Sequence, residues 1–196
     1  AYLNNPASMF GHSLIRIDRP LRNGGTKLLD YTVSFAAMAD DERGVIFAIK
    51  GLTGGYPGKY FMTPYYEKVK SYGDIENRDI WEYRIDLTST EVRRMLMHVW
   101  ELQSAHFDYF FIDENCSYHL LSLLEVACPS LNLTDQFIWW AVPADAIRAV
   151  AEVPGLVKEV KYRPARSTVL RHRALHMGSQ LQDIARDLAE KKISVH

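Results

Sequence analysis

The sequence predicts an α+β domain in which an antiparallel sheet packs against helices. Two β-rich runs, residues 12–18 (HSLIRID) and 28–37 (LLDYTVSFAA), flank an Asn-Gly-Gly turn, as is typical of an antiparallel pair. Helical patterns dominate the second half, and the clearest of them starts at a capping box, Thr88-Ser89-Thr90-Glu91. With 196 residues and 47% hydrophobic content, the chain can form one domain with a sizeable core.

The remaining elements of the first half follow from local pattern. Residues 45–52 (VIFAIKGL) form an apolar run that predicts a third strand, and the glycines and proline within 51–58 predict a loop. Residues 64–72 (PYYEKVKSY) predict a short aromatic helix. Residues 80–87 (IWEYRIDL) predict a fourth strand.

In the second half, apolar residues after the capping box recur with helical spacing, which predicts a helix ending near Ala105. The aromatic segment 107–112 leads to Asn115 and Cys116, and the leucine-rich run that follows predicts a buried helix stopped by Pro129. Further predictions are a helix over 143–150, a basic strand-like stretch over 158–173 and an amphipathic helix over 175–192.

Composition excludes some classes of protein. Charged residues make up 24% of the chain and the net charge is -1, so we expect neither a disordered chain nor a nucleic-acid partner. No window reaches the roughly 18 to 20 apolar residues of a membrane-spanning helix. The chain starts without Met inside a motif, which suggests an excised domain or a processed product. Cys116 and Cys128, about 18 Å apart on one helix, should be free thiols.

Cys116 is the candidate nucleophile. A cysteine at a helix N-terminus experiences the positive end of the helix dipole and unpaired backbone amides, and both favour the thiolate. A small buried hydrophobe is the commoner fate of a lone cysteine, so that interpretation stays open. Cys128 lies at the opposite pole of the same helix and serves as the structural control.

A thiol nucleophile needs a base, and His12 beside Gly11 at the start of the first strand is the candidate. His98 and His106 fall on or after an amphipathic helix, whereas His119 could contact the site or simply pack. The pair His172 and His176 has helical spacing but lacks the glutamate of a zinc-protease motif. We therefore expect neither a metal nor another cofactor.

Two further segments favour surface or pocket roles. The glycine-rich run GLTGGYPGKYF lacks phosphate-loop and dinucleotide signatures, so it is interpreted as a loop bordering a pocket. The basic stretch at 158–173 has six basic residues and Glu159, a local charge of +5 (six minus one), and could meet anionic head groups at a membrane surface. Solvation alone is the commoner explanation of such a run.

Four segments in order, NPASMFGH (5–12), LTGGYPGKYF (52–61), IENRDIWEYRIDLT (75–88) and FFIDENCSYHLLSLLE (110–125), resemble one family. It is the family of the N-terminal periplasmic domain of the bacterial lipoprotein N-acyltransferase Lnb, formerly a domain of unknown function. The resemblance spans about residues 4–150. It implies a single papain-like domain over 1–196, with a family core at about 4–150 and a basic strand pair and C-terminal helix over 151–196.

The order of the parts also resembles circularly permuted papain-like proteins of the NlpC and lecithin:retinol acyltransferase types. There, histidine lies on an early strand and cysteine follows later at a helix N-terminus, and His12 and Cys116 match those positions. A third polar residue on the next strand orients the histidine ring, and Ser34 or Asp30 is the candidate here. The resemblance places other residues around the site: Ser8, Tyr56, Tyr60, Asn115 and His119.

The resemblance implies a cysteine-dependent acyltransferase of the bacterial envelope. Cys116 would take an acyl group from a phospholipid, with His12 as base, and pass it to the amine of a lipoprotein. Backbone amides at the helix start would stabilise the oxyanion. The implied location is the periplasm, as part of a larger membrane-anchored protein. Two alternatives stay open: a thiol amidase or peptidase acting on peptidoglycan, and a non-catalytic envelope binding module.

Overall fold

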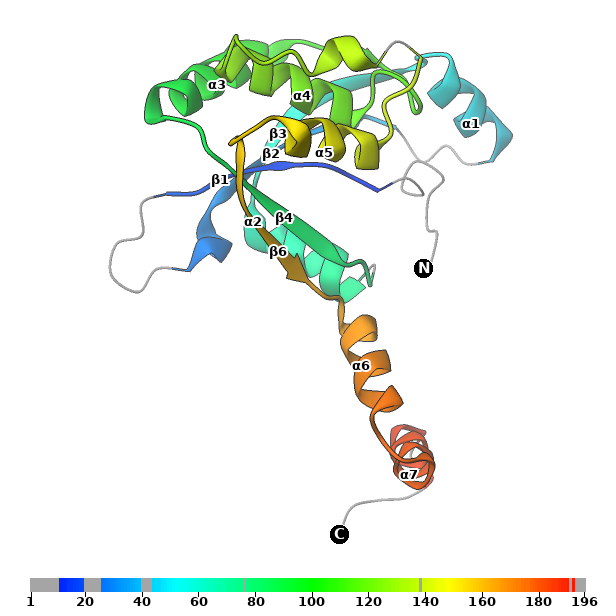
Figure 1. Ribbon diagram of the computed structural model, residues 1–196. Helices are drawn as coiled ribbons and strands as arrows, with labels where there is room; N and C mark the ends of the chain where they lie inside the picture. The colour runs from blue at the N-terminus through cyan, green and yellow to red at the C-terminus, as the bar shows by residue number, and fades with distance from the viewer. Residues whose placement is uncertain are drawn as a thin grey trace.

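The computed structural model describes residues 11–19, 26–39, 44–75, 77–137, 139–190 and 192, without side chains for 73–75. It is an α+β structure with two antiparallel sheets (Figure 1). This confirms the predicted class.

The larger sheet has four strands in the order β1-β2-β3-β5, every neighbouring pair antiparallel. Its strands are β1 (Ile15–Ile17), β2 (Tyr31–Ala37), β3 (Tyr56–Pro64) and β5 (Phe107–Tyr109). On β2, Val33 and Phe35 are fully buried and face the helices, because successive side chains of a strand point to opposite faces. The predicted pairing of the first two strands is confirmed, with Ile15 opposite Val33.

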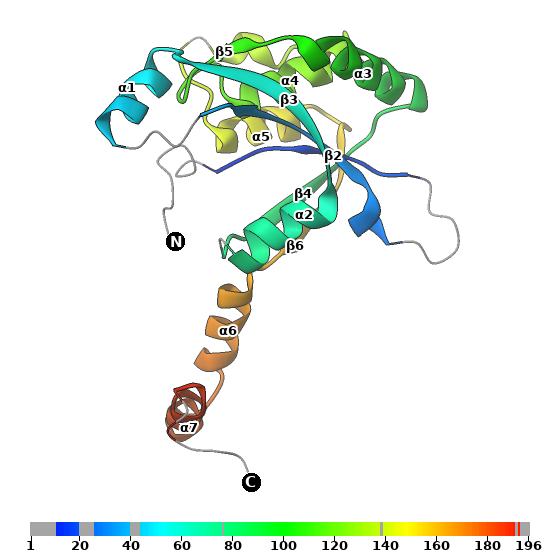
Figure 2. The same ribbon diagram turned by 180° about the vertical axis from the view of Figure 1, so that it is seen from behind.

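Three helices cover one face of this sheet: α3 (Ser89–Glu101), α4 (Cys116–Ala127) and α5 (Pro143–Glu152). The central helix, α4, contacts both of the others and strand β2 (Figures 1 and 2). Leu120, Leu121, Leu123 and Leu124 are each at most 4% exposed, as the leucine run predicts. The capping box forms as predicted, with Thr88 and Glu91 each satisfying a backbone amide of the other.

The second sheet pairs β4 (Ile80–Ile85) with β6 (Val157–Arg163). Glu82 of β4 joins this sheet to the first part of the chain. Its carboxylate accepts hydrogen bonds from Arg16 (2.8 Å), from the Tyr65 hydroxyl (2.6 Å) and from Arg163 (3.3 Å). Tyr65 begins the short helix α2 (Tyr65–Val69), which continues as a wider turn over Lys70–Ile75.

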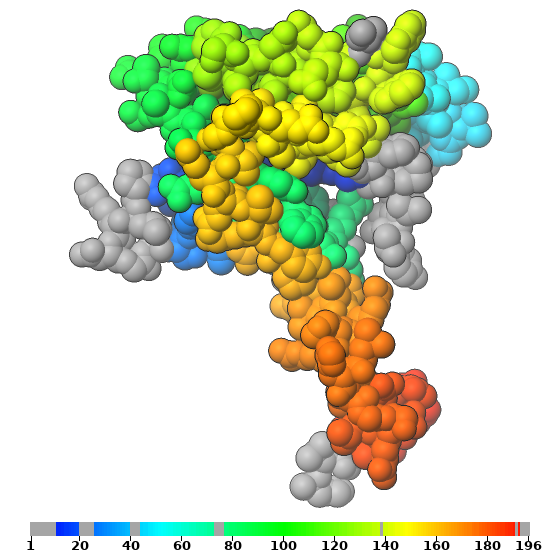
Figure 3. Space-filling view, viewed as in Figure 1, coloured from blue at the N-terminus to red at the C-terminus, as the bar shows by residue number. Residues whose placement is uncertain are grey.

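The C-terminal helices α6 (Arg166–Leu175) and α7 (Ser179–Ala189) project away from the two sheets (Figure 3). Neither contains a buried residue. Single 3₁₀ turns complete the described elements, at Lys27–Leu29, Leu102–Ser104 and Thr134–Gln136. Among the described residues, no helix combines the length and the apolar character that crossing a membrane requires.

Three predictions about elements were wrong. Residues 45–52 form a helix, α1 (Val45–Leu52), and the expected pocket loop contains strand β3. The first error arose because a continuous apolar run does not distinguish a strand from a buried helix. The second arose because Gly58 was interpreted as a loop residue, whereas it lies within a strand whose backbone packs closely against the Phe35 ring. The basic stretch is also not a strand pair: only β6 is a strand, it pairs with β4, and residues 166–175 are helical.

Candidate active site

Cys116 is the first residue of α4, at the positive end of that helix. The preceding residue, Asn115, is the N-cap: its side-chain oxygen accepts a hydrogen bond from the Ser117 amide at 2.9 Å. The Asn115 side-chain amide also donates to the carbonyl of Ala141 at 2.6 Å. Asn115 therefore starts the helix and at the same time ties its first turn to the segment that leads into α5.

The structure brings His12 to Cys116. The imidazole of His12 hydrogen-bonds with the thiol, which also accepts the backbone N–H of Ser13 and lies 3.9 Å from the Ser117 hydroxyl. Burial raises the pKa of the Cys116 thiol, but the hydrogen bond and charge of His12, with the two serine contacts, outweigh it and lower the pKa to about 7. The thiolate is thus accessible near neutral pH.

His12 lies just before β1 rather than on it. Gly11 precedes it with φ +95°, a left-handed conformation that favours glycine, and lies beside Pro143 at the start of α5. The same segment is fixed on the other side by Ser13, whose hydroxyl pairs with that of Ser117 at 2.9 Å. Sequence reasoning did not single out Ser13 or Ser117, although each is adjacent to a proposed catalytic residue.

Tyr109 is a second residue that sequence reasoning missed. The Cys116 backbone N–H donates to the Tyr109 hydroxyl at 3.3 Å, and this hydroxyl also hydrogen-bonds with the thiol. Burial, followed by the negative charge of Cys116, raises the pKa of Tyr109, so the phenol stays protonated and can donate. The only signal in the sequence is its position in the aromatic run seven residues before Cys116, and aromatic runs usually reflect packing.

Of the two candidates for a third polar residue, Asp30 lies away from the site. It lies where β2 begins, beside the C-terminal end of β1, whereas His12 precedes the N-terminal end of that strand. Arg19 binds the Asp30 carboxylate at 3.1 Å. Ser34 is 1% exposed and lies on the face of β2 opposite Val33 and Phe35. The β1–β2 pairing ends at Ile15 opposite Val33, before His12 is reached, so Ser34 as a third catalytic residue stays a prediction. Ser8 lies outside the described residues.

The other predicted site residues are packed in the core. His119 stacks on Phe35 with ring centroids 3.7 Å apart, and burial lowers its pKa to about 4, so the ring is neutral at pH 7. The Tyr60 hydroxyl donates to the carbonyl of His119 at 3.1 Å, which anchors α4 to β3. Tyr56 is 4% exposed and stacks with Phe111. Tyr60 and His119 help to position α4, and all three residues are buried rather than lining an open pocket.

Cys128, the structural control, is the C-cap of α4, with its sulfur 3.2 Å from the Ser130 hydroxyl. Neither cysteine forms a disulfide. His172 and His176 approach each other, with ring nitrogens 3.2 Å apart, but no cluster of three metal-binding side chains occurs in the described ranges. Three of the six basic residues of the basic stretch form ion pairs: Lys158 with Asp86, Lys161 with Glu159 and Arg163 with Glu82.

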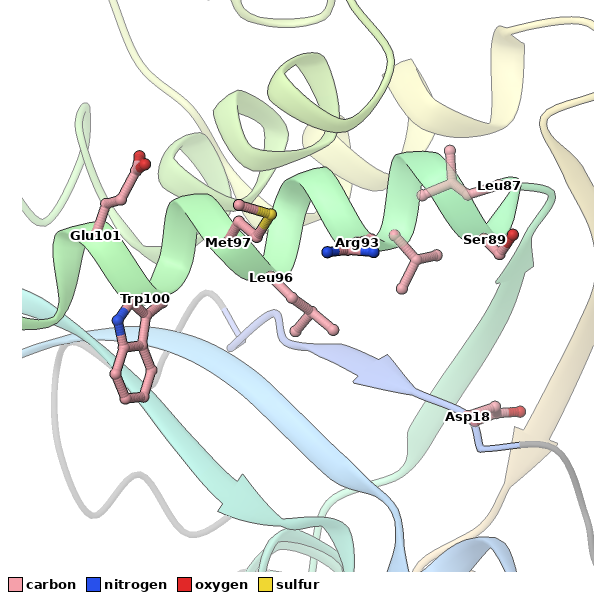
Figure 4. A pocket seen from close by; sticks show the side chains of 9 residues that line it. Asp18, Leu87, Ser89, Arg93, Leu96, Met97, Trp100 and Glu101 are labelled. Atoms are coloured by element: carbon pink, nitrogen blue, oxygen red, sulfur yellow. The ribbon is translucent and has the colours of Figure 1, made fainter.

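One hollow in the described part of the chain lies away from the thiol site. It is a groove of about 670 Å³ beneath α3, open to solvent and bordered by Leu96, Met97 and Trp100 (Figure 4). Neither Cys116 nor His12 lines it. The thiol site instead lies at the end of the molecule where α4 and α5 begin.

The chain matches the family described as Lnb N-terminal periplasmic domain over residues 1–153. Comparisons with curated proteins and with solved structures gave no match. The match covers more than half of the chain and places it in the periplasm, in agreement with the motifs around His12 and Cys116. This protein belongs to the Lnb N-terminal periplasmic domain family.

Proposed function

We propose that the protein is a cysteine-dependent acyltransferase that uses Cys116 as nucleophile and His12 as base. The observation that carries this proposal is the hydrogen bond between the imidazole and a thiol whose pKa is lowered to about 7 at the start of a helix. An early histidine and a later cysteine at a helix N-terminus also fit a circularly permuted papain-like arrangement, which we include in the proposal. The family supports a role at the envelope.

The reaction would have two steps. The Cys116 thiolate attacks the ester carbonyl of a phospholipid, the C–O bond of the ester breaks, and the departing alkoxide takes a proton from the His12 imidazolium. The product is an acyl-thioester. The amine of a lipoprotein then attacks the thioester, an amide bond forms, His12 accepts the amine proton, and the Cys116 thiolate leaves.

The oxyanion of each step needs hydrogen-bond donors. The Tyr109 phenol can donate, and it contacts both the sulfur and the backbone amide of Cys116. This amide donates to the Tyr109 hydroxyl, so the two groups are neighbours, and in the proposed reaction both would face the carbonyl oxygen of the substrate. We assign Tyr109 and the Cys116 N–H as the oxyanion donors.

The test is a mass measurement on the purified chain after incubation with phospholipid. We expect an acyl adduct on Cys116, stable to mild acid and released by hydroxylamine, in the unaltered chain and in Cys128→Ala. Cys116→Ala should carry none, and the full-length protein with this substitution should lose lipoprotein N-acylation. Full activity of Cys116→Ala would refute the proposal.

The same pair could serve a thiol amidase, in which water accepts the acyl group. Incubation with purified cell wall separates the two: release of stem-peptide fragments, with no phospholipid adduct on Cys116, would favour the amidase. His12→Ala distinguishes a thiol enzyme from a non-catalytic binding module. Loss of the adduct in a folded His12→Ala variant requires that the imidazole takes part in the chemistry.

A further inference from the structure

An exposed apolar surface surrounds the end of the molecule that carries Cys116. We call it the apolar rim and define it by seven residues, each between 47% and 77% exposed. They come from helix α1, from the segment before α4 and from the segment before α5: Val45, Ile46, Ile49, Leu52, Ile112, Trp139 and Trp140.

Contacts between backbones bring these three segments together. The Phe111 amide donates to the Gly51 carbonyl of α1 at 2.8 Å, and the Phe111 ring lies where a side chain on Gly51 would be. The Ala141 amide donates to the Ile112 carbonyl at 2.8 Å. Figures 1 and 2 both show α1 at the end of the molecule where α5 begins.

The rim is continuous with the thiol site. Asn115, the N-cap of the Cys116 helix, donates to the carbonyls of Ala141 (2.6 Å) and Phe111 (3.4 Å), the residues that join the rim segments. Cys116 therefore directly follows Asn115, whose side chain is held by the backbone of the rim segments. A ligand resting on this surface would lie next to the segments that hold the start of α4, where Asn115 and Cys116 themselves are 5% and 4% exposed.

Helix α1 is apolar on two faces. Phe47 and Gly51 are buried against Phe111, whereas Val45, Ile49 and Leu52 recur at helical spacing on the exposed side. At eight residues it cannot span a bilayer. A short helix with an outward apolar face, beside a pair of exposed tryptophans, is the composition of a surface that lies in a membrane interface.

We propose that the apolar rim docks the domain onto a phospholipid bilayer and presents Cys116 to the interfacial region. The choice of phospholipid rests on the proposed acyl donor. An apolar helix face sinks about 5–10 Å into the boundary between head groups and acyl chains, which is the depth of the phospholipid ester carbonyls. The ester that Cys116 would attack lies at this level, so docking removes the need to extract the lipid fully.

Charge near the rim favours neutral lipids. Asp113 and Glu114 separate Ile112 from the N-cap, and Lys50 of α1 lies over the Tyr56 ring, 5.8 Å from its centroid. Near Trp140, Asp145 and Arg148 pair with each other at 2.6 Å. Binding should therefore depend on apolar area and gain nothing from anionic lipid, in contrast to docking through the basic stretch at 158–173.

The test uses the whole chain carrying Cys116→Ala, so that chemistry does not contribute, and zwitterionic phosphatidylcholine vesicles. We expect co-sedimentation with the vesicles, weakened at least about tenfold by Ile46→Ser with Ile49→Ser and likewise by Trp139→Ser with Trp140→Ser. The matched control is Met97→Ser with Trp100→Ser, an equally exposed apolar pair on α3, which should bind as the parent does (Figure 4).

A depth measurement needs no change to the rim. Vesicles with brominated acyl chains should quench tryptophan fluorescence, and the quenching should persist in Trp81→Phe with Trp100→Phe, which leaves Trp139 and Trp140 as the fluorophores. Absence of binding by the parent chain, unchanged binding by both rim pairs, or loss of quenching in this variant would overturn the proposal. A parent chain that is a dimer, and that becomes a monomer in the two rim double variants, would also overturn the proposal, since the rim would then be a protein interface.

These outcomes separate docking from chemistry. If the docking proposal alone fails, Cys116 still forms an adduct with a dispersed short-chain ester. If the acyltransferase proposal alone fails, no adduct forms with any ester, yet the Cys116→Ala chain still binds vesicles. Rim variants that retain the adduct with the dispersed ester are folded, so their loss of vesicle binding reports on the surface itself.

Discussion

The Cys116 side chain combines near-complete burial with an acidic thiol. Burial alone would favour the neutral thiol, and the residue is only 4% exposed. His12, Ser13 and Ser117 reverse that preference, because each places a hydrogen-bond donor or positive charge beside the sulfur. Since a buried thiol reacts slowly with any reagent, the pH at which its reactivity rises is more informative than its absolute rate.

The pH dependence of alkylation checks this environment. The thiolate is the reactive form, so modification of Cys116 by iodoacetamide should be slow at pH 5 and half-maximal near pH 7. His12→Ala removes the largest favourable contact and should move the midpoint upward by about one pH unit or more. Peptide mapping of the modified cysteine gives the readout, and Cys128→Ala should leave the profile unchanged. A midpoint at the value of an ordinary thiol would contradict the environment described.

His119 has the opposite behaviour, because burial alone dominates its titration. Its folded-state pKa of about 4 lies below the ordinary value, so between pH 6.5 and pH 4 the unfolded chain binds the proton and the folded chain does not. Stability should therefore fall as pH falls through this window. A phenylalanine at this position would keep the stacking on Phe35 and remove the titration.

We accordingly expect the free energy of unfolding of His119→Phe, relative to that of the parent, to be about 2 kcal/mol more favourable to the folded state at pH 5 than at pH 7. Urea unfolding at the two pH values measures the difference. A constant difference between variant and parent would show that His119 is not buried as a neutral ring. Formation of the Cys116 adduct should be unaffected at pH 7, because His119 takes no part in the proposed chemistry.

Among the elements, β3 depends on close approach of its backbone to the aromatic core. A side chain at Gly58 would begin 2.5 Å from the Phe35 ring, which is fully buried and cannot move aside cheaply. Gly58→Ala should therefore destabilise the protein by about 1–3 kcal/mol in urea unfolding. Gly178→Ala is the control, since its new methyl group would meet nothing within 4 Å, and it should be close to neutral.

The elements also show what sequence reasoning can and cannot predict. The capping box at Thr88 and the Asn115-Cys116 helix start were predictable, because caps are local hydrogen-bonding patterns. Strand β3 was not predictable, because the reason for glycine at position 58 is its close contact with the ring of Phe35, 23 residues earlier in the chain. For α1 a signal existed: Phe47 and Gly51, four residues apart, share its buried face.

The candidate site divides in the same way. The residues alone predicted Cys116 as the nucleophile and favoured His12 over the other histidines as the base, and the family resemblance implied the same two residues. Tyr109 and Ser13 were missed, because their contacts with Cys116 and Ser117 come from strand order and long-range packing, which no local pattern encodes.

On the scale of the whole molecule, the family match ends at residue 153, but the fold continues. Strand β6 pairs with β4 along its whole length, and its Arg163 completes the contacts of Glu82. In contrast, α7 buries no residue and projects from the body (Figure 3). The stable unit therefore extends past the family boundary and stops before α7.

Truncation tests this division. Removal of residues 179–196 should change the melting temperature by less than about 2 °C, because no core contact is lost. Removal of residues 154–196 also deletes β6 and should lower it by more than about 5 °C. Equal effects of the two truncations, followed by thermal unfolding, would mean that β6 adds nothing to the fold.

The hydroxyl pair of Ser13 and Ser117 joins positions 104 residues apart. Contacts of such separation form late in folding, since they require a large loop to close. Until then Cys116 is an ordinary, mostly protonated cysteine. We therefore expect the thiol to stay mostly protonated while the chain folds, and its pKa to fall only when His12 and Ser13 reach the start of α4.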